Sequence, residues 1–505
     1  MSATVWILGD QLVLNHPALT LATEQFGKDN IYVLMIESEE RARRYRYHQK
    51  KLVLIFSAMR HYAEELRTAG FNVDYRIAAE TKAALQKHIQ EYSSEEIIMM
   101  EASEYRGRKF QEDIEDILKI PATLLPNIQF LVGRYQPFPD GKENKRYIHE
   151  QFYRKMRVHF DILMQPNGNP IENKWNFDKS NRRRLPKDAQ PPLPFSFEPD
   201  DITFSVMEEV EKKFRGIGSV RGFNLAVSRK QAQKSAEEFF SQRLPNFGAF
   251  EDAMSNTFDT IYHSKLSPYI NLGLLDPLEL AKEAENKYHS GQAPINSVEG
   301  FIRQIIGWRE YIYWQYWRLG PSLAEKNYWQ ANRPLPEVFW SGDIKMHCLH
   351  KVISRVLESG YSHHIERLMI IANFCLLAGI QPTEVNEWFL STYIDSYEWV
   401  MLPNVLGMGL YADGGEISSK PYIASANYIN KMGDYCLNCS YDRKQRTGDQ
   451  ACPFNYLYWN FILKEEEKLR SNPRMSRSLL GLRNLDKEQR IQLTKNADEF
   501  LKSLA

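Results

Sequence analysis

In the first quarter of the chain, short apolar runs alternate with helical stretches. Four runs rich in β-branched and aromatic residues occupy positions 5–8, 31–36, 73–77 and 97–100, as expected for strands buried inside a parallel sheet. The clearest helical stretch extends from Lys50 to Thr68 and is followed by Gly70, a residue type that commonly ends helices. This alternation predicts an α/β domain over residues 1–132, with a Rossmann-like parallel sheet.

Polar residues follow the first two predicted strands directly. Gly9, Asp10 and Gln11 come after the first strand, and Glu37 stands at the end of the second. Ligands of open parallel sheets bind at the carboxyl ends of the strands. These four residues are therefore candidates for a ligand site, with ordinary strand-to-helix loops as the alternative.

The hydrophobic pattern changes twice further along the chain. Residues 133–225 are dense in proline and charge and weak in periodicity, which predicts a long connector. Residues 226–505 have a helical pattern, and the segments 299–317 and 363–380 are apolar almost all round, as interior helices of a large domain are. The predicted fold is an α/β domain joined by this connector to an all-helical domain.

Composition and charge set limits on this picture. The chain has 505 residues, 43% hydrophobic residues and a formal net charge of zero, so we expect a globular protein with more than one domain. It has no apolar run long enough to span a membrane, and its first residues lack the features of a signal peptide. We therefore expect a cytoplasmic protein that does not associate with membranes.

A zero net charge does not exclude DNA binding, which needs only a local basic patch. The connector supplies a candidate patch in residues 173–187. A basic run with interleaved aromatic residues can hold phosphates and stack on bases, although a solvated loop is the alternative. The residues concerned are Trp175, Phe177, Arg182, Arg183, Arg184 and Lys187.

Three of the five cysteines form a C-x2-C-x12-C pattern: Cys436, Cys439 and Cys452. Such spacing favours a metal centre, and the residues alone leave zinc and an iron–sulfur cluster open. The fourth ligand must come from elsewhere. Cys348 lies near a predicted helix start and is the better candidate, because Cys375 sits in the middle of an apolar helix.

Two segments resemble the photolyase and cryptochrome family. Residues 260–275, TIYHSKLSPYINLGLL, resemble its flavin-phosphate loop, and residues 301–311, FIRQIIGWREY, resemble its Trp-Arg-Glu helix. With the α/β domain and the connector, the resemblance covers nearly the whole chain. The cysteine pattern resembles the bacterial branch with an iron–sulfur cluster, which includes prokaryotic (6-4) photolyases and related cryptochromes.

The resemblance implies three cofactors. FAD would be bound in the helical domain, a [4Fe-4S] cluster by four cysteines, and a 6,7-dimethyl-8-ribityllumazine antenna by the N-terminal domain. Met401 would stand near flavin N5, where the family commonly has a polar residue, and a thioether cannot donate a hydrogen bond. The implied residues are Ser264, Lys265, Leu266, Ser267, Trp308, Arg309, Asp395 and Met401 for FAD; Cys348, Cys436, Cys439 and Cys452 for the cluster; and Gly9, Asp10, Gln11 and Glu37 for the antenna.

The implied activity is light-driven repair of (6-4) pyrimidine photoproducts, a lyase reaction in which the excited reduced flavin gives an electron to a flipped-out lesion. His364 would donate the proton, with His363 beside it, and Leu368 stands where animal relatives carry a second histidine. Electrons would travel through Trp340, Phe389 and Trp388. We expect a monomer whose partner is UV-damaged DNA, with Asp178, Asn181, Arg182 and Arg183 closing over the lesion.

Three other functions remain open from the sequence. A cryptochrome would have the same fold and cofactors but a signalling output. A photolyase for cyclobutane dimers would not need the histidine acid. A light-independent iron–sulfur protein that binds DNA would lack the flavin altogether.

Overall fold

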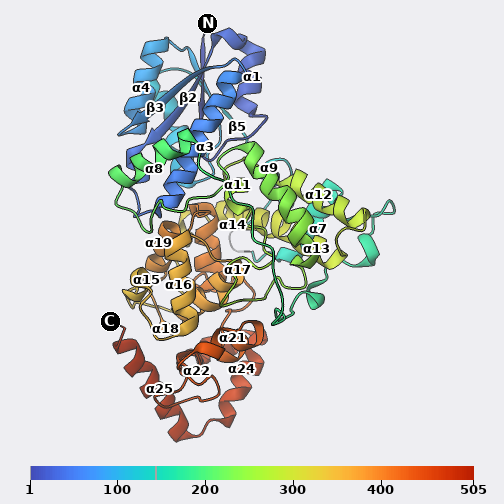
Figure 1. Cartoon of the computed structure of the whole chain (residues 1–505), viewed down its shortest axis with the longest axis vertical. Coiled ribbons are helices and arrows are strands. Elements are labelled where there is room, and N and C mark those ends of the chain that lie inside the picture. Colours follow the sequence, from blue (N-terminus) through green and yellow to red (C-terminus); the bar gives the residue numbers. More distant parts are fainter. Residues whose placement is uncertain (1, 143–144, 505) are drawn as a thin grey trace.

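The computed structural model describes residues 2–142 and 145–504 (Figure 1). Its N-terminal part is a five-stranded sheet in the order β3-β2-β1-β4-β5, and every neighbouring pair is parallel. The predicted parallel sheet is thus confirmed, and the structure adds a fifth strand. The strands are β1 (Ala3–Ile7), β2 (Ile31–Ser38), β3 (Asn72–Ala78), β4 (Glu96–Met100) and β5 (Ala122–Leu125).

The apolar runs form central strands because both faces of the sheet are covered. All five residues of β1 are buried. The predicted long helix is confirmed as α3, which ends at Thr68. Gly70 follows two residues later with a φ of +84°, a conformation that favours glycine. The helices of this part are α1 (Pro17–Phe26), α2 (Glu39–Ala42), α3 (Gln49–Thr68), α4 (Thr81–Tyr92), α5 (Tyr105–Glu112) and α6 (Ile114–Leu118).

The described part of residues 133–225 contains two α-helices, α7 and α8, that the sequence analysis did not predict. In Figure 1, α8 (Asp201–Lys213) lies against α3, and Asp200 caps it by accepting a hydrogen bond from the amide of Thr203. The other helix, α7 (His149–Phe160), packs on the segment that contains Arg309. This stretch of chain therefore contacts both the α/β part and the helical part.

The rest of the chain is helical, and the two segments predicted to be interior helices are largely buried. Among the residues described, none of the helices combines the length and the apolar character needed to cross a membrane. The elements used below are α9 (Arg229–Glu238), α10 (Leu244–Phe247), α11 (Ser267–Asn271), α12 (Pro277–His289), α13 (Ile295–Ile302), η6 (Arg303–Arg309), α14 (Glu310–Leu319), α15 (Val338–Ser341), α16 (His347–Ser359), α17 (His364–Glu366), η8 (Arg367–Ala372), α18 (Asn373–Ala378), α19 (Pro382–Thr392), α20 (Glu398–Met401), η9 (Leu402–Gly409), α21 (Ala426–Met432), η10 (Tyr435–Asn438), α22 (Pro453–Lys464), α23 (Glu466–Arg470), α24 (Ser476–Gly481) and α25 (Lys487–Lys502).

The C-terminal helices form the end of the molecule farthest from the sheet (Figure 1). α25 packs on α22 and begins with a capping box made by Asp486 and Gln489. This charged helix buries one face that includes Leu493 and Leu501.

Candidate functional site

Asp395 binds both α11, which the sequence analysis assigned to flavin binding, and Arg367 of η8, which it did not. Ser267, the first residue of α11, donates its hydroxyl to Asp395 Oδ2 at 2.7 Å. Both terminal nitrogens of Arg367 bind the same carboxylate at 3.0 Å, and the Asn271 amide donates to the Asp395 carbonyl at 2.9 Å. The two ends of α11 are thus fixed against the loop that follows α19. A bidentate arginine–carboxylate pair of this kind holds a defined geometry.

Arg309 reaches the same helix through Gln129. The Arg309 Nη1 donates to the Gln129 carbonyl at 3.3 Å and also binds Glu310, while the Gln129 amide donates to the carbonyl of Asn271 at 2.8 Å. Arg309 Nε and Nη2 are buried and have no hydrogen-bond partner among the described residues. Buried donors normally have acceptors, so these two atoms are available to an anionic group.

The loop before α11 is tightly folded. Lys265 adopts a φ of +55°, and its ammonium lies 5.1 Å from the centre of the Tyr361 ring. Burial lowers the pKa of Lys265 to about 8. The hydroxyl of Ser264 accepts a hydrogen bond from the amide of Leu266 at 3.4 Å, which leaves the hydroxyl proton of Ser264 available to a ligand.

The other two predicted flavin residues lie in different surroundings. Trp308 stacks on His149 of α7, with ring centres 3.8 Å apart. Met401 is buried at the end of α20. Ser267, Arg309 and Asp395 therefore meet around α11, whereas the ring of Trp308 contacts α7.

The two adjacent histidines differ in their surroundings. His364 begins α17 and is exposed; desolvation by the protein around its ring, with the positive charges of Arg367 and His363, lowers its pKa to about 4. His363 is 1% exposed and stacks on His263 with ring centres 4.1 Å apart. The structure thus leaves His364 accessible to a ligand and encloses His363 in the core.

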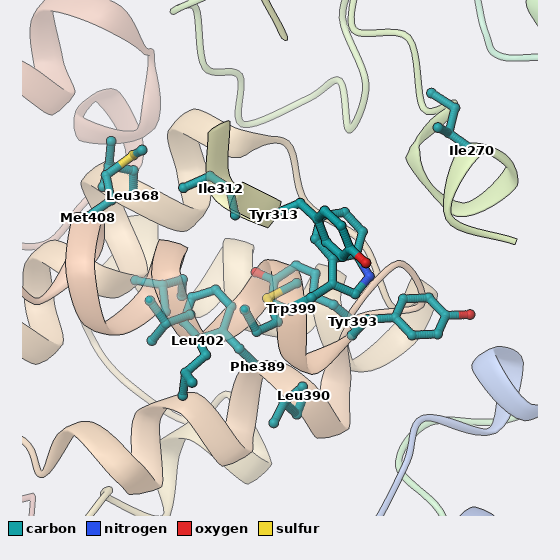
Figure 2. Packing of buried hydrophobic residues seen from close by; sticks show 14 of the residues in the cluster. Ile270, Ile312, Tyr313, Leu368, Phe389, Leu390, Tyr393, Trp399, Leu402 and Met408 are labelled. Carbon is teal, nitrogen blue, oxygen red and sulfur yellow. The ribbon is translucent and has the colours of Figure 1, made fainter. Parts of the chain in front are cut away.

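The three predicted electron-transfer residues lie near one another. Trp388 is fully buried, and its indole N–H donates to the carbonyl of Phe339, the residue before Trp340, at 2.9 Å. Phe389 has its ring centre 5.3 Å from that of Trp388 and 5.2 Å from that of Tyr393. Figure 2 shows Phe389 and Tyr393 within the buried hydrophobic core. Tyr393 is an oxidisable neighbour that the sequence analysis did not name.

Four cysteines line one cavity: Cys348 from α16, Cys436 and Cys439 from η10 and the residue after it, and Cys452 from the residue before α22. Burial, with the neighbouring cysteines adding to it, raises the pKa of Cys436 to about 11 and that of Cys452 to about 12. Cys375 is buried in α18 and is not part of the cavity lining. Within residues 2–142 and 145–504, no three His, Cys, Asp or Glu side chains converge as ligands of one metal ion would.

In the α/β part, Asp10 and Gln11 lie where the strand order reverses, between β1 and β4. Ser103 donates its hydroxyl to Asp10 Oδ2 at 2.5 Å, and the Gln11 amide donates to the carbonyl of Glu101 at 2.8 Å. Asp10 Oδ1 and Gln11 Oε1 are buried without a partner among the described residues, and burial raises the pKa of Asp10. Such reversal points are where open α/β sheets bind ligands.

The two other predicted antenna residues are engaged by their neighbours. A Cβ atom on Gly9 would come within 2.7 Å of Met59 Sδ, so α3 packs directly on that backbone. Glu37 at the end of β2 binds Arg60 Nε at 2.7 Å and accepts a hydrogen bond from the Tyr75 hydroxyl. Glu37 also lines a pocket against α8.

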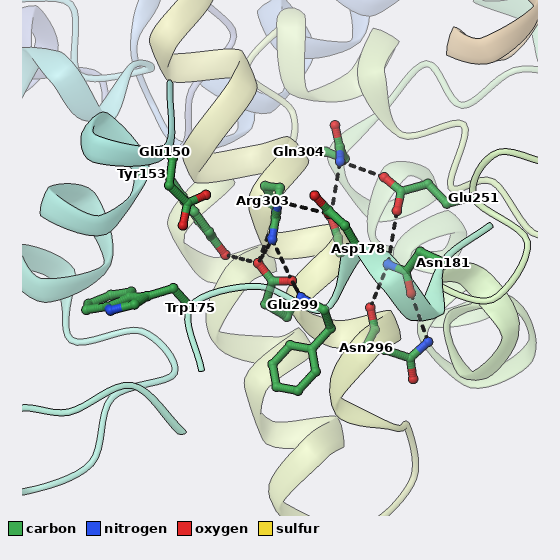
Figure 3. A network of polar contacts seen from close by, with 12 residues as sticks. Glu150, Tyr153, Trp175, Asp178, Asn181, Glu251, Asn296, Glu299, Arg303 and Gln304 are labelled. Carbon is green, nitrogen blue, oxygen red and sulfur yellow. Dashed lines mark hydrogen bonds and ion pairs between the residues drawn. The ribbon is translucent and has the colours of Figure 1, made fainter. Parts of the chain in front are cut away.

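The predicted DNA residues divide into anchored and exposed side chains, and Figure 3 shows the two anchored ones, Asp178 and Asn181. Asp178 binds Arg303 at 2.8 Å. Asn181 is 3% exposed and donates to Glu251 and to the Asn296 carbonyl, both at 3.2 Å. By contrast, Arg182 and Arg183 are exposed. The first two side chains fix residues 178–181 to η6 and α13. Arg182 Nε lies 4.0 Å from Asp252 Oδ2, and both arginines are exposed enough to contact an anionic partner.

Sequence reasoning missed Glu366 and Arg367, although a signal was present. They are the only charged residues in the apolar segment 363–380. Charged groups inside a core are normally paired, so both were candidates for a polar site. Gln129 gave no such signal, because its role depends on contacts with residues distant in sequence.

Comparison with known proteins shows a close relative over the full length. The chain is 42% identical to a (6-4) photolyase from Agrobacterium fabrum, and the match covers all of both chains. The family model described as deoxyribodipyrimidine photo-lyase-related protein matches residues 5–225.

Two solved structures share the fold. A bacterial class III photolyase from Agrobacterium tumefaciens aligns with a TM-score of 0.55 and 17% identity, covering 92% of this chain and 84% of that one. A cryptochrome from Synechocystis aligns with a TM-score of 0.58 and 15% identity, covering 81% of this chain and 82% of that one.

Proposed function

The chain belongs to the family of (6-4) photolyases, and from this membership we infer that it is a deoxyribodipyrimidine photolyase that repairs (6-4) photoproducts in DNA by the use of light. The observation that carries the proposal is the 42% identity to a (6-4) photolyase over the whole of both chains. Around α11, moreover, the arrangement of Ser267, Asp395 and Arg309 suits a bound flavin.

FAD fits the surroundings of α11. The two unpartnered donors of Arg309 suit a phosphate, and Ser264 offers its hydroxyl proton close to the first turn of the helix. The hydroxyl of Ser267 donates to Asp395, so it can only accept a hydrogen bond from the cofactor. When bound, reduced and excited by light, FAD would supply the electron for repair. Replacing both Ser264 and Arg309 by alanine should yield protein with little flavin, measured by absorbance after acid extraction. Full flavin occupancy would mean that the cofactor binds elsewhere.

His364 would hold and donate the proton that repair requires. Its ring is exposed, and at neutral pH it is uncharged in the absence of DNA because its pKa is lowered to about 4. The phosphates of bound DNA are anions, and a nearby anion raises the pKa of histidine. Binding of the substrate would therefore favour the protonated form that can act as the acid.

The test of the function is repair of a (6-4) oligonucleotide under blue light. The parent protein should repair it, and His364→Ala should keep its flavin and its affinity for the lesion but lose at least about 100-fold in repair rate. Absence of (6-4) repair by the parent would overturn the proposal. Repair of cyclobutane dimers alone would assign the protein to the cyclobutane-dimer photolyases. Flavin photoreduction without any repair would assign it to the cryptochromes.

We also propose that Cys348, Cys436, Cys439 and Cys452 hold a [4Fe-4S] cluster. All four line one cavity. Four thiolates are the usual ligands of such a cluster, and the sequence resemblance favours it over zinc, which the same residue types could also bind. Iron and sulfide analysis of the purified protein tests this, and stoichiometric zinc without iron would refute it.

The antenna proposal rests on Asp10 and Gln11. Their unpartnered oxygen atoms can accept hydrogen bonds from the ring or ribityl groups of 6,7-dimethyl-8-ribityllumazine. The carboxylate of Glu37 is already bound by Arg60 and Tyr75. Glu37 would therefore contribute to antenna binding only as part of the lining of its pocket. Asp10→Ala should reduce the lumazine fluorescence of the acid extract and leave the flavin content unchanged; unchanged fluorescence would contradict the assignment.

For electron supply, Trp388 and Trp340 would carry electrons between the surface and the core. Trp388 is buried, and its indole N–H donates to the carbonyl of Phe339, which directly precedes Trp340. Phe389 is difficult to oxidise, which makes Tyr393 the better substitute beside Trp388. Trp388→Phe should block photoreduction with an external reductant, while chemically reduced protein still repairs. Normal photoreduction would exclude this route.

A further inference from the structure

Glu366 is the centre of a buried ionic cluster that the proposed repair reaction does not use. Its side chain is 0% exposed, and its Oε1 lies 2.7 Å from Arg355 Nη1 and 3.3 Å from His363 Nε2. The hydroxyl of Tyr435 donates to the same oxygen. Burial alone would raise the pKa of Glu366, but the charges of His363 and Arg355 lower it to about 2. The carboxylate is therefore ionised, as a buried charge with paired neighbours is expected to be.

Two of these partners come from the segments that carry the cysteines. Tyr435 directly precedes Cys436 and is itself fully buried. Arg355 lies seven residues after Cys348 on α16, so the two share a helix face and are separated by about 10 Å along the axis. The walls of the cysteine cavity and the carboxylate of Glu366 are thus parts of one packed unit.

The third partner leads to the proposed proton donor. His363 directly precedes His364, and its ring stacks on His263 at an interplanar angle of 9°. His263 in turn directly precedes Ser264 of the flavin loop. Of the two ring nitrogens of His363, Nε2 faces Glu366 Oε1 at 3.3 Å as an ion-pair contact, not as a hydrogen bond. The orientation of this ring depends on the stack and on the charge of Glu366.

We propose that Glu366 is a positioning residue, which fixes His363 and through it the imidazole of His364 against the fold that surrounds the cysteine cavity. This inference rests on the proposed function and deepens it. Its physical basis is that His364 is the first residue of a helix that continues from α17 through η8 and α18. The first turn of a helix lacks the backbone hydrogen-bond partners of its interior and frays, so side-chain contacts are needed to hold the direction of His364. Glu366 supplies the anchor within that turn, because Arg355 and Tyr435 hold it from two other elements.

Arg355 allows this anchor to be tested without unfolding the protein. Its Nε binds Asp259 at 2.6 Å, and its Nη2 donates to the Ser255 carbonyl at 3.1 Å. If Glu366 loses its charge, the guanidinium therefore keeps an ionic partner, and no unpaired buried charge is left behind. Glu366→Gln keeps the shape of the side chain and removes the charge. Tyr435→Phe removes only one hydroxyl.

The experiment uses the complete protein with its chromophores, chemically reduced, and a (6-4) oligonucleotide at saturating concentration. Glu366→Gln should lower the repair rate about tenfold or more, because small misplacements of a catalytic group are costly, while the lesion affinity and the flavin and iron contents stay within about twofold. Tyr435→Phe should have the same effect to a smaller degree. Tyr458→Phe is the matched control: its hydroxyl contacts Ser478 at 3.1 Å, away from the histidines, and the repair rate should not change.

Repair rates within about twofold of the parent for both variants would overturn the proposal. So would losses that only follow lost flavin, lost iron or lower thermal stability, since these would indicate a purely structural role. Should the parent itself fail to repair (6-4) lesions, the proposed function fails, and a crystal structure of Glu366→Gln still decides the positioning role. We expect the His363 ring to leave its stack on His263; an unmoved ring would refute the proposal.

Discussion

At the scale of single residues, burial sets the charge state of several histidines. His16 is 1% exposed, and neither ring nitrogen has a partner among the described residues. Burial lowers its pKa to about 3. His48 is also buried, but its Nε2 contacts the Leu357 carbonyl at 3.0 Å, and its pKa is lowered to about 4. His16 therefore acts as an uncharged core side chain ahead of α1, where it forms no cap.

His16 should make the fold sensitive to acid. In the unfolded chain its pKa is near 6.5, above the folded value of about 3, so below pH 6.5 the unfolded state binds a proton that the folded state excludes. The stability from this residue is present at pH 7 and is lost as the pH falls, by about 1.4 kcal/mol per pH unit and roughly 2 kcal/mol at pH 5. His16→Phe should therefore gain about 2 kcal/mol relative to the parent between pH 7 and pH 5, measured by urea unfolding.

A buried side chain that does not titrate provides the control for this measurement, and Leu19 of α1, which is 6% exposed, is one. Leu19→Val should keep a constant difference from the parent at both pH values. A constant difference for His16→Phe as well would mean that the ring can be protonated within the fold.

At the scale of elements, local signals predicted what local sequence determines. The four strands were predicted because each has a short apolar run, and α3 was predicted because a helical pattern is followed by Gly70. β5 was missed because its four residues are only partly buried at the sheet edge, so no strong apolar run marks it. α7 and α8 were missed because their partners, η6 and α3, are distant in sequence. The same holds for the candidate site. The residue types alone identified His363 and His364 as candidates, but only the packing of the folded chain shows that His363 is buried and His364 is exposed.

Residues 178–183 contain two kinds of residue that DNA binding would use, an exposed arginine and a buried asparagine, and the two should respond differently to salt. Arg183 is exposed and would contact a phosphate, so Arg183→Ala should weaken binding to all DNA and reduce the slope of log K against log salt by about 0.9. Asn181 is buried against Glu251 and Asn296, so Asn181→Ala should weaken lesion binding by loosening the segment that carries Arg183, and it should leave the slope unchanged. Fluorescence anisotropy at several salt concentrations measures both effects.

Equal slopes of log K against log salt for the two variants would contradict this division of roles. If Asn181→Ala reduced the slope as Arg183→Ala does, Asn181 would have to face the DNA in the complex. If Arg183→Ala left the slope unchanged, the phosphates would be held by other basic residues.

At the scale of the whole molecule, the cysteine cavity joins segments that are far apart in the chain. Cys348 belongs to α16 in the body of the helical part, whereas the other three line the cavity from the region between α21 and α22. α22 begins directly after Cys452 and carries α25 on its surface. A metal centre in the cavity would therefore fix the C-terminal helices to the rest of the molecule, because binding free energy in such sites contributes to folding.

The consequence is testable with two buried cysteines that differ in position. Cys348→Ala should lose iron and sulfide, lower the thermal midpoint and make the chain around residues 433–452 sensitive to protease, since the C-terminal helices lose their link to α16. Cys375→Ala removes a sulfur of similar burial in α18, and it should keep its iron at a cost of about 1–2 kcal/mol for the small cavity. Metal analysis with limited proteolysis compares the two variants. Full iron content in Cys348→Ala would exclude it as a ligand, and loss of iron from Cys375→Ala would mean that the cluster depends on the packing of α18.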